Sequence, residues 1–276
     1  MAEDPEQWQL VRGAPELYER YLVPAVTSPW AVDLVDRVGV GPGARVLDLA
    51  SGTGVVAWTV ASRVQSAGRV AALDLNAGML RVARSLASAS GRSIEWYEGS
   101  AVALPFGDGE FQVVLCQLGL QFFPDRPRVV QEILRVLALR GRVGASVYTA
   151  IERNPATHAL SDALDRHLGP DASRAKRAEH SLADVRMLRT LFADAGFAEV
   201  RVETVARNVH FASVGEYVRI QFSATPLAAL LEEHKPAMSE RLIALVSADV
   251  GDRLAPYVRK GGLDFPQESH IALATE

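Results

Sequence analysis

Two acidic residues each end a short apolar segment, and a glycine-rich loop follows the first of them. The loop reads Asp48-Leu49-Ala50-Ser51-Gly52-Thr53-Gly54, and Asp74 ends the next apolar segment. Glycines at this spacing let backbone N–H groups approach a ligand closely. A carboxylate about 20 residues further on can accept hydrogen bonds from the hydroxyls of a ribose. The pattern predicts that the loop and Asp74 hold a nucleotide-type cofactor.

Two classes of cofactor fit this loop. The run Gly52-Thr53-Gly54-Val55-Val56-Ala57 matches GxGxxA, which leaves open a nicotinamide cofactor and an oxidoreductase. Asp48 argues against it, because a pyrophosphate at a helix N-terminus needs positive potential. S-adenosylmethionine carries an ammonium and a sulfonium, so an acid beside the loop can help to position its methionine end. Capping of the following helices is the structural alternative for both Asp48 and Asp74.

Three segments in order resemble motifs of class I S-adenosylmethionine-dependent methyltransferases. Residues 46–54 resemble motif I, and Glu98-Gly99-Ser100-Ala101-Val102-Ala103-Leu104-Pro105-Phe106 is similar to the GDAxxLPF element. Leu118-Gly119-Leu120-Gln121-Phe122-Phe123-Pro124-Asp125 resembles the segment after strand four in the ubiquinone and menaquinone biosynthesis methyltransferase group. The likeness covers roughly residues 40–147. It implies methyl transfer from S-adenosylmethionine; the oxidoreductase and a non-catalytic cofactor-binding domain are the alternatives.

The resemblance also implies contacts to the adenosine. Ser100 stands where the family has an aspartate that contacts adenine, and the proline-glycine-glycine before strand five is replaced by Leu139-Arg140-Gly141. Met79 matches an apolar position one turn after the ribose acid, with core packing as its alternative. The cofactor-binding residues expected besides the loop are Asp74, Leu75, Met79, Ser100, Ala101, Gln117 and Tyr21. Tyr18, Tyr21 and Trp30 are expected to pack near the cofactor.

No catalytic base stands out in the sequence. Methyl transfer from a sulfonium gains much of its acceleration from holding the reactants close together, and a base is needed only where the acceptor must lose a proton. The candidates to orient or deprotonate an acceptor are Gln117, Gln121, His158 and His180. We expect no metal. The absence of an (Asn/Asp)-Pro-Pro-Tyr tetrapeptide after strand four argues against methylation of nucleic-acid amino groups.

Alternating strand and helix patterns must position these residues. Strands are expected at 45–49, 69–73, 94–97, 111–116 and 142–148, and helices at 55–64, 77–90 and 128–137. A helix at 182–195 and strands at 198–205 and 269–274 complete the pattern. This alternation predicts an α/β fold with a doubly wound, mostly parallel, seven-stranded Rossmann-like sheet.

The chain divides into a core and helical additions. We expect an N-terminal helical cover at 1–38, a cofactor-binding core at 39–150, a helical insertion at 151–181, a core continuation at 182–212, a helical lid at 213–262 and a final core strand at 263–276. The insertion and the lid carry the apolar residues Leu160, Leu164, Leu168, Phe211, Tyr217, Phe222, Leu227, Leu230 and Leu231. These can roof a pocket for a small-molecule acceptor or form a homodimer contact, and both uses stay open. The expected acceptor is a hydrophobic small molecule, quinone-like or polyketide-like, methylated on oxygen or carbon.

Composition limits the partners. The 276 residues carry a net charge of −4, which offers no general attraction for nucleic acid. The strongest basic cluster, Arg174-Ala175-Lys176-Arg177, is expected to be a solvated face, and the single cysteine, Cys116, a buried thiol. The acidic N-terminus lacks the order of a signal peptide, and no apolar run approaches the ~18 residues of a membrane span. We therefore expect a cytoplasmic protein without a membrane span.

Overall fold

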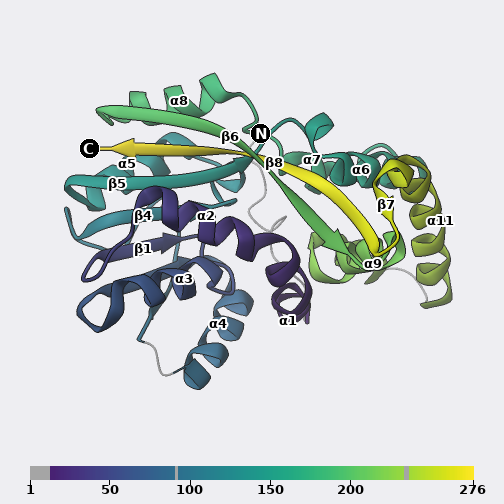
Figure 1. The fold of residues 1–276 in the computed structure, drawn as a ribbon, viewed down its shortest axis with the longest axis horizontal. Helices are drawn as coiled ribbons and strands as arrows, with labels where there is room; N and C mark the ends of the chain where they lie inside the picture. Colours follow the sequence, from purple (N-terminus) through teal and green to yellow (C-terminus); the bar gives the residue numbers. More distant parts are fainter. Residues whose placement is uncertain (1–12, 91–92, 233–235) are drawn as a thin grey trace.

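A mixed sheet forms the centre of the molecule (Figure 1). The computed structural model describes residues 13–90, 93–232 and 236–276. The strands are β1 Arg45–Leu49, β2 Arg69–Asp74, β3 Glu95–Glu98, β4 Phe111–Gln117, β5 Leu137–Tyr148, β6 Glu199–Phe211, β7 Val258–Arg259 and β8 Gly262–Thr275. Their order is β3-β2-β1-β4-β5-β8-β6, and the two-residue β7 pairs with β8 as an eighth strand. Strands β1 to β5 are parallel, and β8 runs antiparallel to β5 and β6. The predicted doubly wound fold is confirmed.

Helices cover both faces of the sheet. Helices α2 (Ser28–Val38) and α3 (Val55–Val64) pack on one face in a cluster around Trp30. Helices α5 (Arg126–Val136) and α8 (Val185–Asp194) belong to the cluster on the other face. Because β4 lies between the two layers, its residues 113–116 are all buried, Cys116 among them.

A second, mainly helical layer lies beyond one end of the strands, to the right in Figure 1. Its helices are α6 Pro155–Leu168, α7 Arg174–Ala178, α9 Val214–Ala224, α10 Ala229–Glu232 and α11 Pro236–Leu254. The N-terminal helix α1 (Ala14–Leu17) and the π-helix η2 (Tyr18–Thr27) pack against it, and α4 (Ala77–Ser90) flanks β2 and β3. The short 3-10 turns are η3 Gln65–Ala67, η4 Leu120–Phe122, η5 Ile151–Arg153, η6 Pro226–Ala228 and η7 Ala255–Tyr257.

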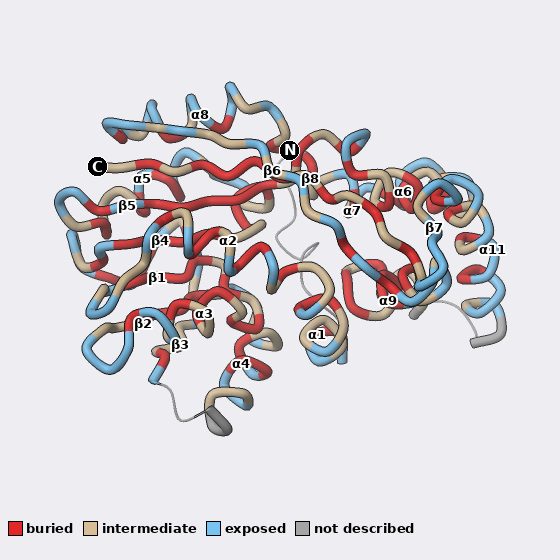
Figure 2. The backbone as a smooth tube through the Cα atoms, in the orientation of Figure 1, coloured by how far each residue is buried: buried red, intermediate tan, exposed pale blue. Residues whose placement is uncertain are grey.

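The apolar lid residues are buried inside this chain. Leu160, Leu164, Phe211, Tyr217, Phe222 and Leu227 belong to one cluster, with Leu168, Leu230 and Leu231 packed against it. Figure 2 shows the same arrangement, with buried backbone facing inward and exposed segments on the outside. The lid therefore has a core of its own.

The strands β6 and β8 are much longer than predicted. Their ladder runs without interruption from Glu199 opposite Thr275 to Phe211 opposite Leu263. The prediction ended β6 at residue 205 and began β8 at residue 269, and so left out the paired segments 206–211 and 263–268, the second of which includes Pro266. That proline lies beyond the end of β5, whose last paired residue is Tyr148, so β8 has a free side there that tolerates proline.

Other boundaries differ by a few residues. Helix α5 begins at Arg126 rather than residue 128, because the Asp125 side chain caps it, and β5 begins at Leu137 rather than residue 142. Helix α8 begins at Val185, after its cap Asp184, instead of at residue 182. Part of the predicted N-terminal helical cover, residues 1–12, lies outside the described residues. No helix in the described part of the chain has the length and apolar character to cross a membrane.

Candidate active site

One cavity of about 430 Å³ lies between the carboxyl ends of the parallel strands and the helical layer. One wall comes from the segments after β1, β2, β3 and β4, and the other from η2, α7, α9 and the outer parts of β6 and β8. The strand order reverses between β1 and β4, so the first wall surrounds the switch point at which open parallel sheets bind ligands.

The glycine loop forms the centre of the first wall. Ala50 and Gly52 have φ angles of 56° and 57°, which turn the chain sharply after β1. The Gly52 N–H donates to Asp74 Oδ2 at 2.7 Å, and this bond ties the loop to the end of β2. Gly54 also has a left-handed φ of 93°, and a Cβ there would collide with the indole of Trp96.

Asp48 lies beneath the loop at the edge of the cavity. Its side chain is buried, and Oδ2 accepts a hydrogen bond from Ala57 N at 2.9 Å in the first turn of α3. Asp48 therefore caps the first turn of α3, which is the structural alternative given for it in the sequence analysis. Burial raises the pKa of Asp48 to about 8, and the nearby Asp74 adds to the increase. A cation in the cavity would favour the ionised form of this carboxyl group.

Asp74 supports the loop and does not cap α4. Its Oδ1 accepts from Asn76 N at 2.8 Å, while Asn76 Oδ1 accepts from Gly78 N and Met79 N at the start of α4. Burial raises the pKa of Asp74. A carboxylate has about four lone-pair sites, so the two bonds from Gly52 and Asn76 leave it able to accept from a ligand.

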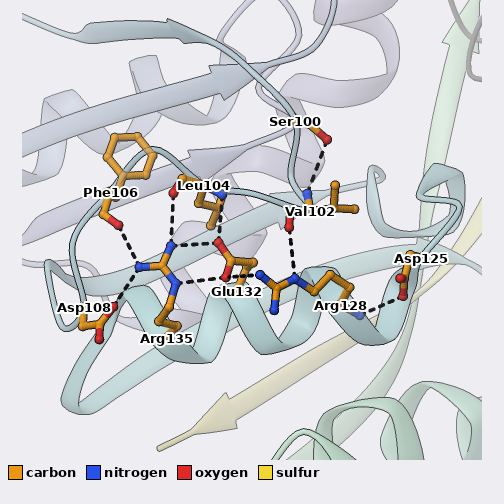
Figure 3. Close-up of polar contacts among 9 residues, drawn as sticks. All are labelled: Ser100, Val102, Leu104, Phe106, Asp108, Asp125, Arg128, Glu132 and Arg135. Carbon is orange, nitrogen blue, oxygen red and sulfur yellow. Dashed lines mark hydrogen bonds and ion pairs between the residues drawn. The ribbon is translucent and has the colours of Figure 1, made fainter.

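The third segment of this wall contains Ser100, Ala101 and Val102. Figure 3 shows how the residues after it are attached to α5. The buried carboxylate of Glu132 accepts from Leu104 N at 2.8 Å and pairs with Arg135 at 2.8 Å. Arg135 donates in turn to the Leu104 and Phe106 carbonyl oxygens. The LPF segment is thus fixed by α5.

Arg128 continues this attachment toward the cavity. Its Nε donates to Val102 O at 3.2 Å, and its Nη2 pairs with Glu132 at 3.2 Å (Figure 3). Ser100 Oγ lies 3.4 Å from Val102 N, so the hydrogen bond that it accepts within this turn is weak. The position of Ser100 at the cavity therefore depends on contacts made by α5.

Most of the predicted cofactor-binding residues line the cavity. These are Asp48, Ala50, Ser51, Gly52, Asp74, Leu75, Met79, Ser100, Ala101 and Gln117. Leu75 is an exposed apolar side chain in this wall. Buried polar atoms without a hydrogen-bond partner among the described residues include Ser51 Oγ, Gln117 Oε1 and Gln221 Oε1, all from lining residues. Because buried polar groups are normally bonded, these atoms are suited to contact a ligand.

The remaining predicted site residues lie outside the cavity lining. Thr53 and Gly54 belong to the loop but begin the turn into α3. Tyr21 packs against the lid cluster, with Arg20 over its ring. Gln121 is buried, and its Nε2 donates to Leu118 O at 2.9 Å.

Neither predicted histidine reaches the cavity. His158 Nε2 lies 3.6 Å from Asp162 Oδ2 on the same helix. His180 Nδ1 lies 2.6 Å from Thr149 O, and its ring packs on Tyr148, which does line the cavity. Burial lowers the pKa of His180. His180 therefore supports the wall from behind.

The second wall contains an ion pair that the sequence analysis missed. Lys176 was expected in a solvated face, but it is 5% exposed and lines the cavity together with Glu179. Lys176 Nζ lies 2.6 Å from Glu179 Oε1. The expectation was wrong for Lys176, because its side chain lies in the cavity wall that also contains residues of η2, β5 and α9, whereas Arg174 and Arg177 are exposed. The small residues Ala175 and Ala178 beside the pair were the only sequence signal of close packing.

Comparisons with known proteins agree with this geometry. The profile of the ubiE/COQ5 methyltransferase family matches residues 25–167, more than half of the chain. The chain belongs to this family. Its members use S-adenosylmethionine, as do methyltransferases of the same fold. The buried polar atoms without a partner and the glycine loop can bond to the polar groups of such a cofactor, and the exposed Leu75 can pack on its apolar part. The residues present therefore fit S-adenosylmethionine.

The relatives of this chain include an uncharacterised protein and two named methyltransferases. An uncharacterised Mycobacterium tuberculosis protein is 34% identical over 45% of this chain and 44% of its own length. The chain thus spans less than half the length of that relative. The demethylmenaquinone methyltransferase of Lactococcus lactis is 30% identical over 63% of this chain and 73% of the enzyme. The chloroplastic 2-phytyl-1,4-beta-naphthoquinone methyltransferase of Arabidopsis thaliana is 33% identical over 61% and 70%.

Solved structures share the fold. The YcgJ protein of Bacillus subtilis superposes with a TM-score of 0.61 at 19% identity, covering 90% of this chain and 98% of that protein. The likeness extends over most of both chains, so this protein shares its overall fold with that structure.

Proposed function

We propose that the protein transfers a methyl group from S-adenosylmethionine to an oxygen or carbon of a hydrophobic small molecule, quinone-like or polyketide-like. The observation that carries this proposal is the single cavity joining the glycine-loop wall to the wall formed by η2, α7, α9 and the outer parts of β6 and β8. Cofactor and acceptor can thus share one space without crossing bulk solvent.

The first wall supplies the contacts for the cofactor. Asp74 would accept from ribose hydroxyls, Leu75 and Met79 would pack on the adenine, and Ser100 would contact its edge. Asp48 and Ser51 lie on the side suited to the charged methionine end. The cofactor supplies an electrophilic methyl group on a sulfonium. The chain's part is to hold the acceptor in line with it and to exclude water.

The second wall suits an apolar acceptor with a few polar groups. Leu22, Val26, Phe211 and Phe265 contribute hydrocarbon and aromatic surface. Pockets of this composition bind small apolar molecules and orient them through a few polar side chains. The naphthoquinone for which the Arabidopsis thaliana relative is named has this character. A polymer would have to displace the helical layer, so we favour a small molecule.

Two measurements test the proposal. Isothermal titration should detect binding of S-adenosylmethionine and S-adenosylhomocysteine but not of NAD. Mass spectrometry of reactions with a panel of hydroquinones and phenols should then show products that have gained one methyl group. Binding of NAD without either sulfur cofactor would replace the proposal by the oxidoreductase alternative. Tight cofactor binding without turnover of any acceptor would favour a non-catalytic role.

A further inference from the structure

The ion pair Lys176–Glu179 lies in a largely shielded part of the cavity wall. Both side chains are largely shielded, at 7% and 14% exposure, and both line the cavity. Removing charged groups from water is costly, and apolar residues of similar volume often stabilise a fold as well as a buried ion pair does. A pair that faces a ligand cavity therefore points to a role in binding.

Three tyrosines surround the pair from separate elements. Tyr18 comes from η2, Tyr148 from β5 and Tyr217 from α9, and all three line the cavity. Burial, reinforced by the charge of Glu179, raises the pKa of Tyr18 to about 12 and raises those of Tyr148 and Tyr217. The tyrosines are therefore neutral at physiological pH, and the pair provides the charge in this wall.

The pair has bonding capacity that the protein leaves unused. Lys176 Nζ has three donor positions, of which one is directed to Glu179 Oε1. The contact with Lys176 uses Glu179 Oε1, so Oε2 is available to accept a hydrogen bond from a ligand. Gln221 Oε1, also in the lining, has no partner there either. A hydroxyl group placed at the pair could donate to Glu179 Oε2 while its oxygen accepts from Lys176 Nζ.

We propose that Lys176 and Glu179 form the binding site for an acidic hydroxyl group, phenolic or enolic, of the methyl acceptor. This inference rests on the proposed function and adds the residues that recognise the acceptor. As the methyl group is transferred, Glu179 Oε2 takes the hydroxyl proton and Lys176 holds the oxygen while it carries negative charge. On oxygen, the electron pair left there would form the new bond to the methyl carbon while the bond from that carbon to the cofactor sulfur breaks, and the electrons of the broken bond would stay on the sulfur of S-adenosylhomocysteine. On a conjugated aromatic carbon the same bonds would form and break, after which that carbon would lose its own proton to water and the oxygen would regain one.

The experiment compares a hydroxyl probe with its ether. The full chain, saturated with S-adenosylhomocysteine, is titrated with 1-naphthol and with 1-methoxynaphthalene. Hydrogen bonds to charged groups should make naphthol bind at least about tenfold more tightly than the ether. In the double variant Lys176→Met with Glu179→Met the two probes should bind within about twofold of each other. The single variant Lys176→Arg, which keeps a positive charge beside Glu179, should show part of the native preference for naphthol over the ether.

A matched variant controls for the loss of one charge of each sign. Arg174→Met with Glu152→Met makes the same change at exposed positions and should keep the full preference for naphthol. Equal affinity of the native chain for the two probes, failure of both to bind, or a preference that survives in the cavity variant would each overturn the inference. The proposed function fails separately, if S-adenosylhomocysteine does not bind the native chain.

Discussion

Asp48 shows how one side chain can serve the fold and a ligand at the same time. It ends β1, accepts from Ala57 N in α3 and reaches the cavity. The spacing of Asp48, the glycines and Asp74 predicted that they would meet, because the carboxyl ends of neighbouring parallel strands lie together. What spacing could not predict was that Asp74 binds the loop itself, since that bond depends on the conformation of residues 50–54.

The raised pKa of Asp48 predicts proton release on cofactor binding. With a pKa of about 8 the carboxyl group is mostly protonated at pH 7, and a bound ammonium would favour the ionised form. Binding of S-adenosylmethionine should release close to one proton at pH 7, and this release should disappear well above pH 8. Isothermal titration in buffers of different ionisation enthalpy measures it. The Asp48→Asn variant should release much less, and an unchanged value would assign the proton to another group.

Asp74 should contribute to cofactor affinity through charged hydrogen bonds. We expect Asp74→Ala to weaken S-adenosylhomocysteine binding by about 1.5 to 3 kcal/mol. Asp74→Asn can still accept from Gly52 N, so it separates the support of the loop from the contact to the ribose. Titration calorimetry of both variants gives the comparison. A dissociation constant unchanged in both would remove Asp74 from the ribose site.

Among the elements, α5 has the least obvious role in the site. The sequence predicted only a helix at 128–137, yet Arg128, Glu132 and Arg135 fix the segment that carries Ser100 (Figure 3). The resemblance of Leu104-Pro105-Phe106 to a family motif identified this segment but did not show which contacts hold it in place. The explanation needed the distances from α5, because the bonds join residues some thirty positions apart.

The Glu132 network should contribute measurably to stability. Glu132→Gln loses charged hydrogen bonds in a buried position, so we expect the free energy of unfolding to fall by about 1.5 to 3 kcal/mol. Asp108→Asn removes an exposed partner of the same Arg135 and should cost less than about 1 kcal/mol. Denaturant unfolding monitored by circular dichroism measures both.

The pH dependence gives a second check on Glu132. Arg135 lowers the pKa of Glu132 below its ordinary value of 4.5. A lowered folded-state pKa means that the stabilisation is complete above 4.5 and is lost as the pH falls through the folded-state value. The difference between the native chain and Glu132→Gln should therefore be constant near neutral pH and shrink in acid. A difference independent of pH would show that the charge of Glu132 is not the cause.

At the scale of the whole molecule, the arrangement of sheet and lid was only partly accessible from sequence. Strand and helix periodicity predicted the doubly wound core, because each element there buries one regular face. The lid depends on contacts between distant segments, such as those that bury Lys176, and local patterns do not encode these. For the same reason the sequence predicted apolar lid residues but left open whether they form a roof or a dimer contact.

A cavity built from both layers predicts that ligand binding stabilises the entire chain. At a hundred times the dissociation constant, S-adenosylhomocysteine should add about 2.7 kcal/mol. For a chain of this size that corresponds to a rise in Tm of roughly 5 to 10 °C. Differential scanning fluorimetry at equal concentrations of S-adenosylhomocysteine and NAD provides the measurement. A rise with NAD alone would contradict the assignment of the cofactor.

The unbroken ladder of β6 and β8 limits how ligands can enter and leave. The two strands pass from the sheet into the lid, so swinging the lid away as a rigid flap would require bending or breaking paired backbone between residues 205 and 211. The wall from Tyr18 to Thr27 is not part of a strand ladder: it is a π-helix that contains Pro24, and Gln117 Nε2 donates to the Thr27 carbonyl oxygen at its end at 3.0 Å. We therefore expect substrate and product to enter and leave on the N-terminal side of the cavity, where a small movement of this helix would leave the β6–β8 ladder intact.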